Sequence, residues 1–127
     1  MRRWPGRGAS SSSAAGAFLD RPRTIDALRA LAGRLAVRDR RVLRVVLFGS
    51  LATGRATIRS DADLLIVLGG HPAPPRERIA EYLDAFREAP VPVDVFPFTV
   101  EEMEHRRARG DAFVRRVDAQ GVDLLER

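Results

Sequence analysis

The sequence predicts a single α/β domain, in which a small mixed β-sheet carries helices on its surface. Two observations predict this class. Residues 45–68 contain two apolar runs typical of buried strands, separated by a Gly-Ser turn and a polar connection. Apolar residues recur at helical spacing in 23–37 and 76–89, on either side of this pair of strands. The chain of 127 residues is long enough for one hydrophobic core, and the predicted domain spans 24–127.

The elements of the first half can be placed in order. A helix is predicted over 23–37, with Thr24 as its N-cap, because apolar residues recur there every three or four positions. A first strand is expected over 42–48, where the residues are nearly all apolar. A short helix at 52–55 then precedes the second strand at 61–68.

The second half continues the alternation of helix and strand. The helix over 76–89 is expected to cover the sheet with an apolar stripe formed by Ile79, Tyr82, Leu83 and Phe86. The next strand, 91–98, contains two prolines, which favour an edge position in the sheet or irregular strand ends. Residues 99–102 have a capping-box pattern, which predicts a helix that ends at Gly110. A last helix and a short last strand are expected at 111–120 and 122–125.

Composition and charge exclude several classes of function. The chain has no cysteine and no lysine, which rules out disulfides, thiolate zinc sites, cysteine nucleophiles and a P-loop lysine. The net charge is +5, but most of it comes from residues 1–23, so the remainder offers no evident electrostatic footprint for nucleic acid. No apolar run is long enough to span a membrane, and the composition is compatible with the reducing cytoplasm.

Residues 1–23 are predicted to be a disordered tail outside the domain. Their first part is rich in Ser, Ala, Gly and Arg and can bury too little apolar surface to order itself. Three alternatives are open: a start codon assigned too early, a transit peptide, or a segment that orders on a partner with Trp4 as its anchor.

Gly49 and Ser50 follow the first strand and form a candidate phosphate-binding turn. A glycine lets the backbone bend sharply and lets a phosphate approach the main chain. The N–H groups beyond it can then point at an anion, especially where they open a helix. Arg55 or Arg59 is expected to neutralise charge on the phosphates, the alternative being that both are plain surface arginines.

Asp61 and Asp63 open the second strand and are candidate metal ligands. Residues two apart on a strand point to the same face, so both carboxylates converge on one spot about 6–7 Å apart along the strand. Like charges so close repel unless a cation lies between them, and Mg²⁺ prefers one or two such carboxylates together with water and substrate phosphates. Taken alone, an Asp-x-Asp pattern is also compatible with a solvated turn.

Asp94 is the single acid in an otherwise apolar strand, and we expect it to be buried there. A buried carboxylate has to be paired, hydrogen-bonded or bound to a metal. With the Asp61 and Asp63 strand beside it, Asp94 would complete a three-carboxylate site able to share a pair of Mg²⁺ ions. The alternatives are an N-cap or a salt-bridge partner.

The pattern Gly49-Ser50, ten residues, Asp61-Ala62-Asp63 resembles the signature of the minimal nucleotidyltransferases, small members of the DNA polymerase β-like superfamily. The likeness covers about residues 24–127 and extends to the strand that carries Asp94. It implies a polymerase β-like nucleotidyltransferase fold, in which Asp94 is associated with the catalytic metal and with activation of the attacking hydroxyl. Leu51 departs from the basic or aromatic residue that many relatives carry after Gly-Ser, so a nucleotide contact there is in doubt.

The resemblance also implies a function. Stand-alone minimal nucleotidyltransferases commonly act as antitoxins that transfer AMP from ATP to a tyrosine of a HEPN-domain toxin, within a hetero-oligomer. This is the leading hypothesis. The alternatives are a small-molecule enzyme of the kanamycin nucleotidyltransferase type, acting on an aminoglycoside, and an antitoxin that neutralises its partner by contact alone. Large members carry extra domains for nucleic acid or sugar substrates, for which we expect no room in this chain.

Overall fold

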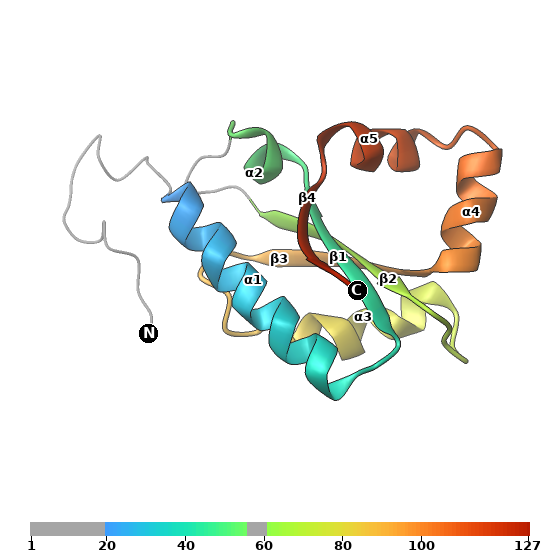
Figure 1. The fold of residues 1–127 in the computed structure, drawn as a ribbon, viewed down its shortest axis with the longest axis horizontal. Helices are drawn as coiled ribbons and strands as arrows, with labels where there is room; N and C mark the ends of the chain where they lie inside the picture. The colour runs from blue at the N-terminus through green and yellow to red at the C-terminus, as the bar shows by residue number, and fades with distance from the viewer. Residues whose placement is uncertain (1–19, 56–60) are drawn as a thin grey trace.

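The computed structural model describes residues 20–55 and 61–127, so the predicted tail lies almost wholly outside the described residues. Four strands form one mixed sheet in the order β3-β2-β1-β4, which confirms the predicted fold class (Figure 1). The strand β1 pairs antiparallel with β2 and β4, whereas β2 pairs parallel with β3. The strands are β1 Val42–Phe48, β2 Ala62–Leu68, β3 Val93–Thr99 and β4 Val122–Glu126. The helices are α1 Arg21–Arg38, α2 Ser50–Thr53, α3 Pro75–Asp84, α4 Val100–Ala108 and α5 Ala112–Gln120.

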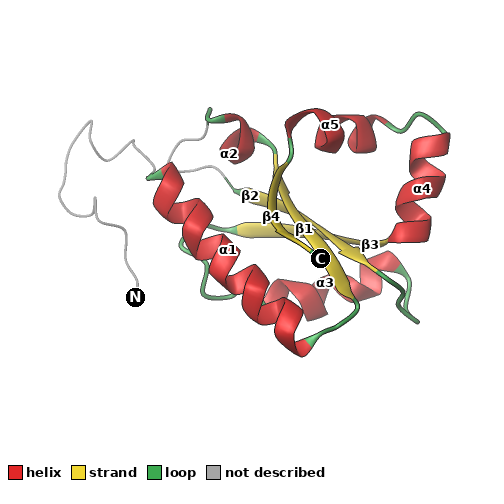
Figure 2. Ribbon diagram, in the orientation of Figure 1, coloured by secondary structure: helices red, strands yellow, loops and turns green. Residues whose placement is uncertain are grey.

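Helices cover both faces of the sheet, so the strands separate two cores (Figure 2). Alternate residues of a strand point to opposite faces. In β1, Val45 and Leu47 therefore join the core under α1 and α3, while Val46 and Phe48 join the core under α4 and α5. This division matters for function because each polar residue of a strand can be assigned to one face.

The helix α1 begins earlier than predicted and has a different N-cap. It starts at Arg21, and the side chain of Asp20 accepts a hydrogen bond from the N–H of Arg23. Thr24 is buried inside the first turn, where its hydroxyl donates to the carbonyl of Asp20. The prediction of Thr24 as the cap is therefore wrong, because Asp20 reaches the free N–H groups one turn earlier.

The helix α3 is shorter than predicted and buries only part of its apolar stripe. It ends at Asp84, and Phe86 lies in the turn that follows. Tyr82 and Phe86 are buried as expected, whereas Ile79 and Leu83 each remain 40% exposed. The reason is position: α3 packs mainly against β3, an edge strand, so the outer half of the stripe has no sheet beneath it.

The chain after β3 follows the sequence expectations closely. Thr99 and Glu102 form the predicted capping box, in which each side chain accepts a hydrogen bond from the backbone N–H of the other residue. Gly110 follows α4 with a φ of 70°, the left-handed conformation expected at a helix end. The edge position of β3, predicted from its prolines, is also confirmed.

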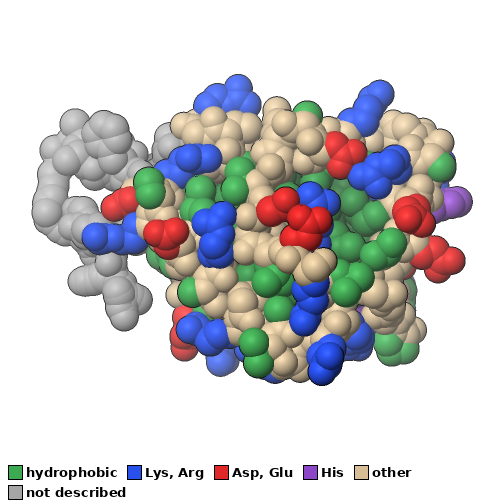
Figure 3. Space-filling view, viewed as in Figure 1, with side chains coloured by type: hydrophobic (Ala, Val, Ile, Leu, Met, Phe, Trp, Pro, Cys, Tyr) green, Lys and Arg blue, Asp and Glu red, His purple; other side chains and the backbone are tan. Residues whose placement is uncertain are grey.

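Charged side chains of both signs are mixed on the face of the molecule that Figure 3 shows. Ion pairs between charged side chains occur within the described residues, such as Arg44 with Asp123 at 2.9 Å and Arg107 with Asp118 at 2.8 Å. This mixture agrees with the small net charge that the sequence gives to residues 24–127. Within 20–55 and 61–127, none of the helices combines the length and the apolar character that crossing a membrane requires.

Candidate functional site

The predicted Gly-Ser turn lies where β1 ends and α2 begins (Figure 1). Gly49 has φ 85° and ψ −160°, a backbone conformation that is essentially restricted to glycine. The short helix α2 spans Ser50–Thr53, two residues earlier at each end than the predicted 52–55, and Gly54 follows it in the left-handed conformation. The sharp change of direction at the end of this buried strand therefore requires a glycine at position 49.

Gly49 lies directly against the carboxylate of Asp63. A Cβ atom added to Gly49 would lie 2.5 Å from Oδ2 of Asp63, closer than real Cβ atoms approach any neighbour. The two residues face each other because Phe48, the last residue of β1, pairs in register with Asp63 near the start of β2. The turn and the carboxylate thus form one compact unit.

Asp63 and Asp94 are partners in the parallel register between β2 and β3. Register partners on neighbouring strands lie about 4.8 Å apart and point to the same face. The alternation along both strands assigns them to the face that carries Leu65, Phe96 and the helices α4 and α5. The structure therefore brings these two predicted site residues together.

Asp94 is exposed, contrary to the prediction that it is buried. It is the second residue of β3, and β3 is an edge strand. The apolar residues that surround Asp94 in the sequence are buried or partly buried further along the strand. The sequence alone did not show that Asp94 itself lies at the exposed start of the strand. Burial is therefore not the argument for a functional role of Asp94; its register with Asp63 is.

Asp61 lies just before β2 and is exposed. Among the residues that the structure describes, no group of three or more His, Cys, Asp or Glu side chains is arranged to hold a metal ion. The predicted three-carboxylate cluster is thus not assembled in this conformation. What the structure shows is the Asp63 and Asp94 pair, with Asp61 close enough to interact electrostatically with Asp63.

The pKa of Asp63 is raised, which means that the charged form of this carboxylate is disfavoured in its surroundings. Burial is the main cause, and repulsion from Asp94 and then from Asp61 adds to it. Arg116 acts in the opposite sense by attraction. A bound cation would stabilise the charged form of this carboxylate, because it would offset the repulsion and part of the cost of burying the charge.

The side chains around the turn differ in their orientation. Ser50 and Arg55 are exposed, so both are accessible beside the Gly49 turn. Leu51 is fully buried and belongs to the core under α1. The departure from relatives at this position therefore places an apolar side chain in the core, where that side chain cannot contact a nucleotide. Arg59, the other arginine considered for the phosphates, lies outside the described residues.

Arg21 supports the turn, although the sequence analysis assigned it to the tail. Its Nε donates to the carbonyl of Leu51 at 2.9 Å, and its Nη2 donates to the carbonyl of Ala52 at 2.8 Å. These carbonyls lie in a helix of four residues, whose C=O groups have few partners inside the helix. The first turn of α1 thus holds α2 in place, a contact between distant segments that no local pattern reveals.

Arg116 is a second residue of the site that sequence reasoning missed. It lies on α5, with its guanidinium carbon 5.9 Å from the ring centroid of Phe48. Phe48 is the register partner of Asp63, so this position also accounts for the attraction between Arg116 and that carboxylate. The only hint in the sequence was an arginine on the predicted last helix, one of many.

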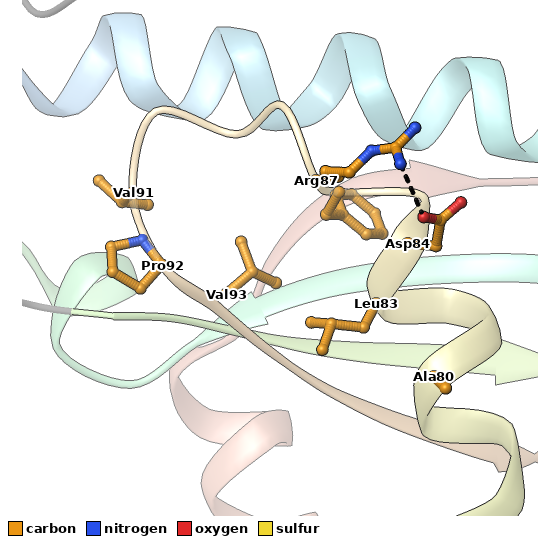
Figure 4. Close-up of a pocket in the computed structure, with 8 residues that line it drawn as sticks. Ala80, Leu83, Asp84, Arg87, Val91, Pro92 and Val93 are labelled. Carbon is orange, nitrogen blue, oxygen red and sulfur yellow. Dashed lines mark ion pairs between the residues drawn. The ribbon is translucent and has the colours of Figure 1, made fainter.

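An apolar groove of about 440 Å³ lies between α3 and the segment that leads into β3 (Figure 4). Leu83 and Val93 line it, and the ion pair between Asp84 and Arg87 borders it. Val93 packs with the core under α1 and α3, so the groove is on the opposite face of β3 from Asp94. We therefore do not include it in the dicarboxylate site.

A mixed sheet that carries a Gly-Ser turn against two aspartates in register agrees with the arrangement that the resemblance to nucleotidyltransferases implies. The sequence model of the family described as nucleotidyltransferase domain (NTP_transf_2) matches residues 28–119, a range that contains Gly49, Asp63 and Asp94. The chain belongs to this nucleotidyltransferase domain family. No match was found among curated proteins.

Two solved structures illustrate the likeness of the fold. A protein from Sulfolobus solfataricus, proposed to be a nucleotidyltransferase, is similar with a TM-score of 0.61 and 19% identity, over 84% of either chain. A crystal structure described as a toxin-antitoxin with AMP-PNP matches with a TM-score of 0.47 and 19% identity, over 86% of this chain and 75% of that chain. At this identity the first likeness establishes the fold alone, and the second is too distant to support an argument.

Proposed function

We propose that this protein is a Mg²⁺-dependent nucleotidyltransferase that transfers AMP from ATP to a hydroxyl group of a partner protein. The observation that carries the proposal is the contact between the Gly49 turn and Asp63, with Asp94 beside it in register. A turn that can receive phosphates and a pair of carboxylates are the two parts that metal-assisted nucleotidyl transfer requires.

The donor set fits a divalent cation. Mg²⁺ prefers carboxylate oxygens and commonly takes one or two of them, with water and substrate phosphates in its other positions. Asp63 and Asp94 supply two carboxylates, and we propose Asp61 as a further ligand for a site that holds two ions with the nucleotide. When bound, the ions would polarise the phosphates and neutralise charge on the leaving pyrophosphate.

The residues of the chain would then act as follows. The backbone of Gly49 and the exposed Ser50 hold the terminal phosphates of ATP, and Arg55 adds positive charge beside them. Asp94, which is open to solvent, accepts the proton of the attacking hydroxyl. A bond forms between the acceptor oxygen and the α-phosphorus, while the bond from that phosphorus to the bridging oxygen breaks and pyrophosphate leaves.

For the acceptor we propose a tyrosine of a HEPN-domain toxin, so that the protein acts as an antitoxin in a hetero-oligomer. The support is the resemblance to minimal nucleotidyltransferases. The Asp63 and Asp94 pair favours catalysis over neutralisation by contact alone, because like charges in register destabilise a sheet and a pure binding protein has no need of them.

The test is transfer of label from α-³²P ATP in the presence of Mg²⁺ and the product of the neighbouring gene, which is the candidate partner. The wild type is compared with Asp63→Asn and with the control Asp26→Asn, which changes an aspartate whose side chain is 79% exposed on α1. We expect label on the partner with the wild type and the control, and none with Asp63→Asn.

Other outcomes point to the alternatives. A tight complex without label would indicate an antitoxin that acts by contact alone. Absence of a complex, together with consumption of ATP when an aminoglycoside is added, would indicate a small-molecule enzyme. Equal labelling by Asp63→Asn and the wild type would contradict the assignment of the site itself.

A further inference from the structure

Arg116 lies on α5 and interacts electrostatically with Asp63 of the carboxylate site. Its guanidinium carbon is 5.9 Å from the centroid of the Phe48 ring, which is within the range of a cation–π contact. Phe48 pairs with Asp63 in β1 and β2 and immediately precedes Gly49. The guanidinium therefore lies on the same face of the sheet as the carboxylate of Asp63, next to the residue that precedes the turn.

The backbone that carries Arg116 is held firmly. Val114 and Val117, on either side of it in the sequence, are buried in the core under α4 and α5. Gly121, which follows the helix, is tightly packed: an added Cβ would lie 2.6 Å from the carbonyl oxygen of Val117 and 2.6 Å from Cγ1 of Val46. The position of Arg116 relative to the sheet is thus determined by packing.

Unlike Arg106 and Arg107, Arg116 has no ion-pair partner among the described residues. Arg106 pairs with Asp111 at 3.2 Å, and Arg107 pairs with Asp118 at 2.8 Å. For Arg116, no carboxylate of the described residues lies within ion-pair distance. Its attraction to Asp63 acts at longer range, so the exposed guanidinium keeps its hydrogen-bond donors available for a ligand.

We propose that Arg116 is a substrate-binding residue that contacts the phosphates of the nucleotide, stacked on Phe48 beside the Gly49 turn. The inference rests on the proposed function and adds a residue from the last helix to the site. In the protein without nucleotide, the guanidinium balances part of the negative charge of the carboxylate pair. With the nucleotide present, a planar guanidinium can donate two hydrogen bonds to one phosphate, a geometry that a glutamine cannot reproduce.

The chain provides a matched control for this proposal. Arg115 is the preceding residue of the same helix and is also exposed, but no contact joins it to Phe48 or Asp63. We would compare Arg116→Gln and Arg116→Lys with Arg115→Gln. Calorimetry would measure binding of a non-hydrolysable ATP analogue with Mg²⁺, and separately of Mn²⁺ alone.

Two opposite shifts are expected for Arg116→Gln. The Kd of the nucleotide should rise about 10- to 100-fold, the value of a charge-assisted hydrogen bond to phosphate. The Kd of Mn²⁺ alone should fall about two- to fivefold, because a cation that competes for the carboxylates has been removed. Arg116→Lys should lie between the wild type and Arg116→Gln, and Arg115→Gln should match the wild type in both measurements.

The outcomes separate the inference from the proposed function. Nucleotide binding by the wild type that is unchanged in Arg116→Gln would overturn the inference and leave the function standing. An equal loss in Arg115→Gln would show a general effect of surface charge and would also overturn it. If the wild type binds neither Mn²⁺ nor nucleotide, the proposed function fails, and the role of Arg116 fails with it.

Discussion

Replacing Gly49 by alanine tests the contact on which the site is built. The conformation of Gly49 is essentially restricted to glycine, which alone costs about 1–3 kcal/mol for another residue. The new Cβ would also lie 2.5 Å from Oδ2 of Asp63, and relief of such overpacking typically costs about 1–3 kcal/mol more. We therefore expect Gly49→Ala to lower the free energy of unfolding by about 2–6 kcal/mol, a large part of the stability of a small domain.

Gly54→Ala is the matched control. Gly54 has a similar φ, 83° against 85°, but an added Cβ there meets nothing within 4 Å. This substitution should therefore show only the backbone cost of the left-handed conformation, about 1–2 kcal/mol. Urea unfolding followed by circular dichroism gives both values under the same conditions.

A double-mutant cycle with Asp63→Ala isolates the contact. Removing the carboxylate leaves the backbone cost of Gly49→Ala but abolishes the clash, so in that background the cost should fall to about 1–3 kcal/mol. The reasoning is refuted if Gly49→Ala is no more harmful than Gly54→Ala. It is also refuted if the cost of Gly49→Ala is the same with and without Asp63.

Three further predictions concern the surroundings of the site. Arg21→Ala removes two hydrogen bonds to α2, so it should lower the free energy of unfolding by about 1–3 kcal/mol and weaken nucleotide binding. As a control, Arg23→Ala at an exposed position should change the free energy of unfolding in urea by less than about 0.5 kcal/mol. Asp94→Asn should abolish transfer in the labelling assay. In urea unfolding it should stabilise the fold by about 0.2–1 kcal/mol, because it removes a like charge beside Asp63. A loss of stability would contradict the repulsion between the two carboxylates. Hydrogen bonds from Arg78 lower the pKa of Glu102 below its ordinary value of 4.5. Their stabilising effect is therefore present above that pH and is lost as the pH falls through the lowered pKa. Glu102→Gln should make thermal unfolding less sensitive to acid over that range, and an unchanged acid sensitivity would argue against this pairing.

The sheet and most helix ends were predictable because their signals are local. The predicted strand 42–48 matches β1, since its apolar residues fill both cores. The capping box at Thr99 was legible because two side chains three residues apart satisfy each other's backbone N–H groups. The Gly-Ser turn was equally visible, because a buried strand must change direction where its apolar run ends.

The rest of the site depends on contacts between distant segments. Sequence pattern placed Asp94 in an apolar strand but could not show that its own position is the exposed start of an edge strand. Arg21 and Arg116 were missed for the same reason: each reaches the site from another helix, 30 residues before Leu51 in one case and beyond β3 in the other. Only the packing of α1 and α5 on the sheet makes these arginines different from the many others in the chain.

The arrangement of the strands explains how the sheet tolerates two carboxylates in register. β1 ends where the parallel strands β2 and β3 begin, so one end of the sheet joins the turn at Gly49 to the first residues of both. Asp63 lies on an inner strand, and burial together with the repulsion from Asp94 disfavours its charged form, which raises its pKa. Asp94 lies on the edge strand and keeps its hydration, which weakens the repulsion that two buried charges would feel. Placing the second acid at the edge thus keeps two neighbouring carboxylates compatible with a stable fold, and it leaves Asp94 exposed, as its proposed role with an attacking hydroxyl group requires.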